Sequence, residues 1–186
     1  KHFYNNENLS TLYIGGGTPG IIGAERLSSI AETAKSAFMI DENAEITAEL
    51  NPASADESFD FARLRQAGFN RLSIGMQSAN NNELKRLGRL HTAEDVKTTV
   101  LNARKAGFKN ISLDLMLCIP EQTKESLAHS IEYCSELGVD HISAYILKIE
   151  EGTPFYKEKD ALTLDEDTQA EFYLFACEKL EQFGYH

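Results

Sequence analysis

Three polar side chains that could bind a ligand occupy matching places in the sequence, each near the carboxyl end of a strand-like apolar run. Glu49 ends "EITAE", Gln77 ends "RLSIGMQ", and Asp114 lies in "ISLDLML". Carboxylate and amide oxygens accept hydrogen bonds, and an amide also donates them, so such a set can hold hydroxyl and ammonium groups. A fourth run, "LYI", is followed by "GGGTPG", where bare backbone allows the close approach of a ligand.

The glycine-rich stretch at 15–20 does not fit the two common phosphate-binding motifs. The dinucleotide fingerprint needs a third Gly that opens a helix, and Gly20 has that spacing but follows Pro19 directly. A P-loop needs Gly-Lys-Ser or Gly-Lys-Thr, which does not follow. Pro19 stiffens the exit from the stretch and removes one backbone donor. A ligand-binding loop and a plain strand-to-helix turn both remain open for this stretch taken alone.

The elements that would position these residues repeat along the chain. Three segments share the end of a helix, a Gly, an apolar residue, two polar residues and a strand. They are "LRQAGFNRLSIGMQ" (64–77), "ARKAGFKNISLDLM" (103–116) and "CSELGVDHISAYIL" (134–147). Their glycines suit the left-handed position just past a helix, so we expect positive φ at Gly68, Gly107 and Gly138.

Helices are expected between the strands, because apolar residues recur there at helical spacing. The expected ranges are 24–38, 56–67, 93–106, 124–137 and 165–183. Alternation of helix and strand predicts an α/β fold with a parallel sheet. The strand ends recur every 28 to 37 residues. An eight-unit barrel has a step of about 31 residues, and an open doubly wound sheet gives similar steps.

We expect one domain over residues 1–186, a partial (β/α) TIM-like barrel with outer helices that is truncated at both ends. The chain opens almost directly into a strand, and "CEKLEQFGYH" at 177–186 repeats the helix–Gly signal with no strand after it. We therefore expect missing elements on both sides, including the strand that should come first.

The expected strands alternate between apolar and polar residues, unlike the continuous apolar runs of a sheet covered on both faces. In 111–117, for example, Leu113 and Leu115 flank Asp114. The apolar face must dock on helices, so the polar face is expected to line a wet or ligand-filled interior, because an unpaired buried carboxylate is costly. The alternatives are a partly solvated antiparallel sheet, and a structural ion-pair role for Glu49 or Asp114.

Composition excludes several other classes of protein. The 186 residues are 42% hydrophobic and carry a formal charge of −11, which argues against a nucleic-acid surface. No apolar stretch is long enough to predict a membrane span. The three cysteines, Cys118, Cys134 and Cys177, match no metal or cluster spacing and form no disulfide scaffold. A reducing compartment, the cytoplasm, is expected.

Six motifs follow one another along the chain: "YIGGGTP", "EITAELNP", "NRLSIGMQS", "LGRLH", "ISLDLMLCIP" and "DHISAYILKIEEGTPFY". In this order they resemble the oxygen-independent coproporphyrinogen III oxidase family of radical S-adenosylmethionine (SAM) proteins. The amino-acid sequence of the last motif more closely resembles the heme-chaperone branch of this family. The resemblance covers roughly residues 11 to 186, and the order of the motifs is more specific than any one of them.

The resemblance implies roles for the glycine stretch and for Glu49. Gly16, Gly17 and Thr18 match the loop that borders the methionine group of SAM, where backbone carbonyls can accept from its ammonium. Glu49 matches a carboxylate that holds SAM, and its charge suits an ammonium group or ribose hydroxyls.

The resemblance also implies roles for four residues further along the chain. Gln77 and Asp114 match residues that bind SAM, where an amide and a carboxylate can hold a diol. Arg89 matches an arginine suited to the SAM carboxylate, although without the motif a solvated surface arginine is the simpler interpretation. Lys148 lies where the family contacts the nucleoside through its backbone. His91 is expected at a helix start or on the surface rather than as a heme ligand.

Two departures from the family pattern matter. The C-x-x-x-C-x-x-C loop that binds the family's [4Fe-4S] cluster is not in this sequence, so no metal ligand and no catalytic residue is assigned to it; the ligands are expected upstream of Lys1. In "MLCIPEQT" the family usually has Gly at the position of Cys118 and a further Gly at that of Glu121.

Three functions stay open. The chain is part of a heme-binding chaperone, of an oxidase that decarboxylates propionate side chains of coproporphyrinogen III through a SAM-derived radical, or of an unrelated hollow barrel enzyme. The first is favoured by the motif at 140–156. The implied cofactors are SAM, a [4Fe-4S] cluster and, for the chaperone, heme. The implied partners are a tetrapyrrole and heme-acceptor proteins.

Overall fold

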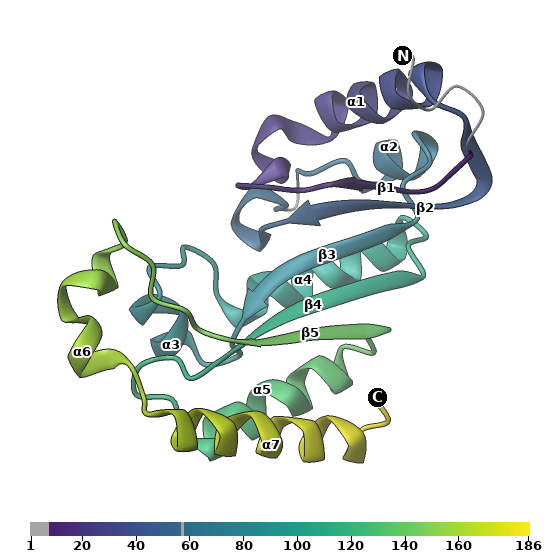
Figure 1. Ribbon diagram of the computed structural model, residues 1–186. Helices are drawn as coiled ribbons and strands as arrows, with labels where there is room; N and C mark the ends of the chain where they lie inside the picture. The colour runs from purple at the N-terminus through teal and green to yellow at the C-terminus, as the bar shows by residue number, and fades with distance from the viewer. Residues whose placement is uncertain (1–7, 57) are drawn as a thin grey trace. The chain divides into compact units, whose positions relative to one another are not determined.

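The computed structural model describes residues 8–56 and 58–186, and its strands form one five-stranded sheet (Figure 1). The strands pair in chain order: β1 (Leu9–Ile14), β2 (Ile40–Leu50), β3 (Arg71–Gln77), β4 (Asn110–Leu117) and β5 (His141–Ile146). The sheet is parallel, as the alternation of helix and strand predicts. The expectation of an α/β fold of the partial-barrel type is confirmed.

All five expected helices are present. They are α1 (Gly23–Ala37), α2 (Phe61–Gln66), α4 (Ala93–Lys105), α5 (Lys124–Glu136) and α7 (Glu166–Gln182). Helix α2 begins at Phe61 rather than at residue 56, because the side chain of Asp60 caps it by accepting from the backbone N–H of Arg63 at 2.9 Å. Five short helical segments were not expected: α3 (Asn81–Arg86), α6 (Lys159–Leu162), and the 3₁₀ turns η1 (Pro19–Ile22), η2 (Pro52–Ser54) and η3 (Pro154–Glu158).

The chain divides into two compact units, each with its own core. The first runs to Gly75 and includes Glu94–Ser112. In it, α1 and α2 pack against each other and lie on the same side of β1 and β2 (Figure 1). Its fully or almost fully buried residues include Leu27, Ala31, Ile46, Ala48, Leu64, Phe69, Leu72 and Val100.

The second unit comprises Met76–Ala93 and Leu113–His186. In it, α5 and α7 lie side by side (Figure 1), and Phe172 and Ala176 are the buried residues of α7. Its core includes Met76, Leu84, Leu113, Leu115, Leu117, Leu127, Ile131 and Cys134. The thiol of Cys134 lies 3.7 Å from the sulfur of Met76, which ties the core face of α5 to the end of β3.

The predicted apolar face is confirmed at the centre of β4. Leu113 and Leu115 are completely buried, whereas Asp114 between them is half-buried. On the polar face of β2 and β3, Thr47 and Ser73 are nevertheless buried, so part of this face is covered rather than open. The three helix-ending glycines also have the expected positive φ, between 61° and 96°. No helix in the described part of the chain has the length and apolarity needed to cross a membrane.

Candidate functional site

The glycine stretch leaves β1 beside the end of β2. In the parallel register Ile14 lies opposite Ala48, so the next residues, Gly15 and Glu49, are neighbours. The Oε2 atom of Glu49 accepts a hydrogen bond from the backbone N–H of Gly16 at 2.9 Å. The Oε1 atom accepts one from the hydroxyl of Tyr13 at 2.5 Å. The half-buried Glu49 carboxylate therefore ties the start of the glycine stretch to β2.

A side chain at position 15 would displace Tyr13 and Glu49. A Cβ atom there would lie 2.6 Å from the ring of Tyr13 and 2.8 Å from the carboxyl carbon of Glu49. Gly16 and Gly17 are required for conformation instead, because their φ values are +90° and +63°. The space around both is open, and both are exposed. The stretch is thus a turn whose backbone remains accessible next to a carboxylate.

Thr18 ends the glycine stretch and precedes η1. Its carbonyl accepts from the backbone N–H of Ile21 at 3.0 Å, and its side chain makes no capping hydrogen bond. Thr18 is half-buried next to Gly17. Its role in SAM binding stays a prediction.

Gln77 ends β3 in an unusual conformation. Its φ is +71°, which is uncommon for a residue other than Gly, Asn or Asp. Its side chain is buried, and its Oε1 atom accepts from the hydroxyl of Tyr145 on β5 at 2.7 Å. The next residue, Ser78, is completely buried.

Asp114 lies inside β4 rather than at its end, which corrects the expected strand boundary. Strand β4 continues to Leu117 because Leu115 and Leu117 extend the buried apolar face. The carboxylate of Asp114 still belongs to the polar face of the strand, between the buried side chains of its neighbours.

Arg89 and Lys148 differ in their surroundings. Arg89 is half-buried in the turn after α3, where its backbone N–H donates to Leu84 O at 2.9 Å; no described residue forms an ion pair with its guanidinium. Lys148 is exposed after β5 and lies 2.8 Å from a carboxylate oxygen of Glu150. Their hydrogen bond and mutual attraction raise the pKa of Lys148 and lower that of Glu150. The side chain of Lys148 is therefore engaged in a surface ion pair.

His91 lies two residues before α4, as expected of a residue at a helix start, but it is buried and not on the surface. Its Nε2 atom lies 3.1 Å from Met76 O. The ring therefore contacts the backbone directly before Gln77. Burial of a histidine in a loop leaves no trace in apolar periodicity, so the sequence alone could not place it.

Sequence analysis assigned no site role to three residues that make hydrogen bonds at or near the predicted binding residues. Tyr13 and Tyr145 hydrogen bond to Glu49 and Gln77, respectively. Their positions could have been read from the strand alternation, which places Tyr13 on the same face as Gly15. Glu83 is a buried carboxylate on α3, a helix with a single apolar residue and therefore no apolar periodicity.

The family's two glycine positions in the turn after β4 carry Cys118 and Glu121, with φ values of +60° and +70°. Glycine is the residue that adopts this conformation without steric cost. The backbone of the turn is thus the one that a glycine would favour, even though this chain has larger side chains there.

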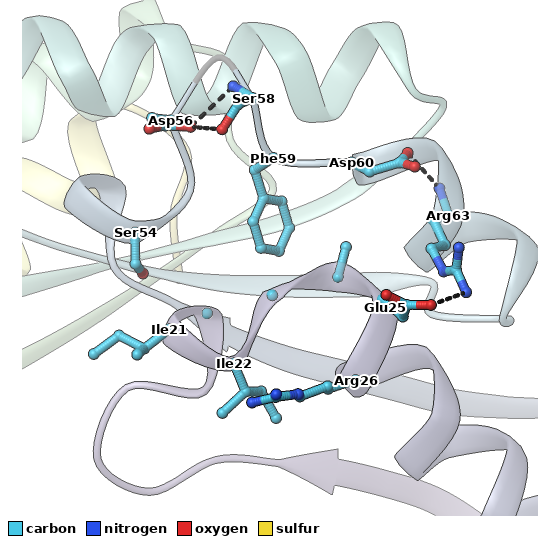
Figure 2. Close-up of a pocket in the computed structure, with 13 residues that line it drawn as sticks. Ile21, Ile22, Glu25, Arg26, Ser54, Asp56, Ser58, Phe59, Asp60 and Arg63 are labelled. Carbon is cyan, nitrogen blue, oxygen red and sulfur yellow. Dashed lines mark hydrogen bonds and ion pairs between the residues drawn. The ribbon is translucent and has the colours of Figure 1, made fainter.

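A pocket of about 780 Å³ lies elsewhere in the first unit, between η1 and the start of α1 on one side and residues 54–56 and 58–63 on the other (Figure 2). Glu25 and Arg63 form an exposed ion pair at 3.4 Å at its edge, and Phe59 points into it. Hydrogen bonds from the side chain and backbone of Ser58 lower the pKa of Asp56. The pocket contains none of the residues predicted to bind SAM, and its charged groups are exposed.

The described residues do not fit an iron–sulfur cluster. No group of three or more His, Cys, Asp or Glu side chains in the described ranges is arranged to hold a metal ion. Cys118 and Cys134 are buried, and burial raises their pKa values to about 11 and about 12. Such thiols stay protonated at neutral pH, whereas a metal ligand must be a thiolate.

The chain is similar to known proteins over most of its length. The model of the Radical SAM superfamily matches residues 1–134. The heme chaperone HemW of Bacillus subtilis (strain 168) is 37% identical over 185 residues, which cover 96% of this chain and 48% of the relative. HemW of Mycobacterium tuberculosis is 34% identical over 180 residues, covering 95% of this chain and 46% of the relative. The chain spans about half the length of these curated relatives.

Solved structures agree with this similarity. The coproporphyrinogen III oxidase HemN of Escherichia coli, described as a radical SAM enzyme, matches with a TM-score of 0.81 and 27% identity, over 96% of this chain and 42% of that chain. Methylornithine synthase (PylB) matches with a TM-score of 0.65 at 15% identity, over 91% of this chain and 48% of that chain, which shows the fold alone.

Proposed function

The chain belongs to the radical SAM superfamily, and from that premise we propose that it is the SAM-binding part of a radical SAM protein of heme metabolism, of the heme-chaperone type. The similarity to curated HemW chaperones and to the HemN structure supports this proposal. Members of this superfamily use SAM together with a [4Fe-4S] cluster. The tetrapyrrole would be heme, passed on to heme-acceptor proteins, and the compartment would be the cytoplasm.

In the first unit, Glu49 and the glycine stretch bind the polar end of SAM. The Glu49 carboxylate already accepts from Gly16 N–H and from the Tyr13 hydroxyl, and each carboxylate oxygen has a further lone pair to offer a ligand donor. The backbone of Gly16 and Gly17 is exposed and bare of side chains, so its carbonyls can accept from an ammonium group. Thr18 contributes at the end of the same stretch. These donor and acceptor types fit SAM.

In the second unit, four residues contribute separately. Gln77 presents its amide N–H group, because its oxygen already accepts from Tyr145. The carboxylate of Asp114 accepts from ribose hydroxyls, and the guanidinium of Arg89 binds a carboxylate. Lys148 contributes its backbone only, because its ammonium is paired with Glu150. When bound, SAM supplies radical chemistry through one-electron cleavage of its sulfonium C–S bond.

The observation that carries the proposal is the Glu49 carboxylate bonded to Gly16 N–H next to open glycine backbone. Its test is calorimetric titration of SAM into the full-length gene product with its cluster reconstituted. Glu49→Ala should weaken SAM binding by one to two orders of magnitude, as expected for losing a hydrogen bond to a charged group. Ile30→Ala, an exposed site on α1, is the control and should bind normally. Unchanged affinity in Glu49→Ala would remove Glu49 from the site.

A second candidate function is oxygen-independent oxidation of coproporphyrinogen III, which the similarity to HemN favours. The two functions differ in what the full-length gene product does with a tetrapyrrole under anaerobic conditions. Stoichiometric heme binding without decarboxylation supports the chaperone. Loss of carbon dioxide from coproporphyrinogen III supports the oxidase.

A further inference from the structure

Gln77 has both an unusual backbone conformation and a buried, hydrogen-bonded side chain. It is a non-glycine residue with φ +71°, and its side chain is buried with the oxygen bonded to Tyr145. A strained backbone of this kind persists only where the surrounding structure holds it in place, and such residues cluster at ligand sites. The Nε2 group of Gln77 has no hydrogen-bond partner within the ranges the structure describes. The amide is thus oriented with its donor left for a ligand.

The residues on both sides of Gln77 are fixed by hydrogen bonds. Before it, Met76 O lies 3.1 Å from His91 Nε2 and accepts from Ser78 N–H at 3.0 Å. After it, the hydroxyl of Ser78 donates to Glu83 Oε2 at 2.7 Å and accepts from Asn80 N–H at 2.8 Å. Ser78 is completely buried, so water does not compete for these bonds.

Glu83 gathers donors from three segments of the second unit. Its Oε2 atom also accepts from Gln122 Nε2 at 3.2 Å, in the turn after β4, and its Oε1 atom accepts from the hydroxyl of Ser126 in the first turn of α5. The carboxylate is 5% exposed and has no cation against it among the described residues. Hydrogen bonds to a charged acceptor are strong, and a buried carboxylate needs all of them.

Through Gln122, the Glu83 carboxylate is also connected to the turn after β4, which is the second turn with left-handed backbone. The side chain of Gln122 also donates to Met116 O at 3.2 Å and accepts from Ile119 N–H at 3.4 Å. It therefore spans the turn that contains Cys118 and Glu121, both with positive φ. One buried charge connects the turn after β3 with the turn after β4.

We propose that Glu83 is a positioning residue, which acts through Ser78 to hold Gln77 in its left-handed conformation with the amide presented to the ligand. This rests on the proposed SAM-binding function. Glu83 itself touches no ligand. A purely structural role would stabilise the unit without affecting how Gln77 binds, and the two roles differ in one measurable quantity, the coupling between Glu83 and Gln77 in SAM affinity.

The test is a double-mutant cycle in the full-length gene product, with SAM affinity measured by calorimetry and stability by urea unfolding. Glu83→Gln keeps the shape but turns one acceptor into a donor that faces Ser78 and Gln122. It should weaken SAM binding on the order of tenfold in the wild-type background and not at all in Gln77→Ala. The stability loss should be the same in both backgrounds. Tyr185→Phe, which removes a hydroxyl bond to Val139 O and belongs to neither turn, should leave SAM affinity unchanged.

The positioning role would be overturned if Glu83→Gln weakened SAM binding equally in both backgrounds. It would also be overturned if Glu83→Gln had no effect on affinity while Gln77→Ala bound SAM weakly. Either result would leave the proposed function intact. Unchanged affinity in Gln77→Ala itself would refute the binding role of Gln77, and the inference with it. If Glu83→Gln does not fold, Ser78→Ala removes the link between Glu83 and Gln77 together with the bond from Asn80 N–H, and it leaves the bonds from Gln122 and Ser126 to Glu83 in place. The same pattern of coupling is expected from it, and equal effects in both backgrounds would again refute the proposal.

Discussion

The turn after β1 and the turn after β3 both place left-handed backbone beside a residue proposed to bind SAM, but they achieve it with different chemistry. After β1, Gly16 and Gly17 adopt positive φ in an exposed stretch, and one carboxylate, Glu49, anchors it. After β3, the left-handed residue is Gln77, which is buried between hydrogen-bonded neighbours. Glycine needs little support for this conformation, whereas Gln77 needs a network. The left-handed backbone of the first turn should therefore survive the loss of neighbouring hydrogen bonds better than that of the second.

The largest effect is expected from a change of strand face in the second unit. Leu113→Asp places a charge where a completely buried leucine packs, and we expect the second unit to unfold, because an unpaired buried charge costs several kcal/mol. Circular dichroism and urea unfolding measure this. Asp114→Asn, one residue further on the other face, is the matched control and should stay folded. A stable, folded Leu113→Asp protein would mean that the strand faces are reversed.

In the first turn, two glycines should respond differently to the same substitution. Gly15→Ala forces Tyr13 and Glu49 apart and should lower SAM affinity by at least tenfold, because the bond from Gly16 N–H to Glu49 is lost. Gly17→Ala meets no atom and should cost about 1–2 kcal/mol of stability from its positive φ, with a smaller loss of affinity. Equal affinities for the two variants would contradict the anchoring role of Glu49.

Alkaline pH should destabilise the second unit before the first, because the buried cysteines Cys118 and Cys134 both lie in the second. Burial raises the pKa of Cys118 to about 11 and that of Cys134 to about 12, above the ordinary value of 9.0. A raised folded-state pKa contributes stability that is complete below pH 9 and is lost as the pH rises toward 11–12. Hydrogen exchange should show the second unit losing protection first above pH 9. Cys134→Ala should reduce this pH dependence; an identical profile would contradict it.

The smallest effect is expected in the turn after β4. Glu121 is exposed with φ +70°, so Glu121→Gly should stabilise the protein by about 0.5–1 kcal/mol, the strain relieved less the entropy that glycine costs. Urea unfolding measures it. Gly17→Ala, the reverse change in the first turn, provides the comparison of opposite sign. Destabilisation by Glu121→Gly would show that its side chain has a structural role.

Periodicity in the sequence was enough to predict the helices α1, α2, α4, α5 and α7, the buried face of β4 and the glycines that end helices. These features follow from local spacing, such as the alternation around Leu113. The support of Gln77 could not be predicted, because Ser78, Glu83 and Gln122 meet only through the folded turns. Helix α3 contains a single apolar residue, Leu84, so it shows no apolar stripe. The bond between Tyr13 and Glu49 depends on the register of β1 and β2, which alternation alone does not give.

The most direct measurement of SAM binding by both turns is hydrogen–deuterium exchange of the full-length gene product with its cluster reconstituted, with and without SAM. We predict slower exchange on SAM binding at 15–18 in the first unit and at 77–79 in the second. The pocket segment (residues 54–56 and 58–63) should be unchanged and serves as the internal control. Protection confined to the pocket segment, or no protection at either turn, would contradict the proposal that these strand ends bind SAM.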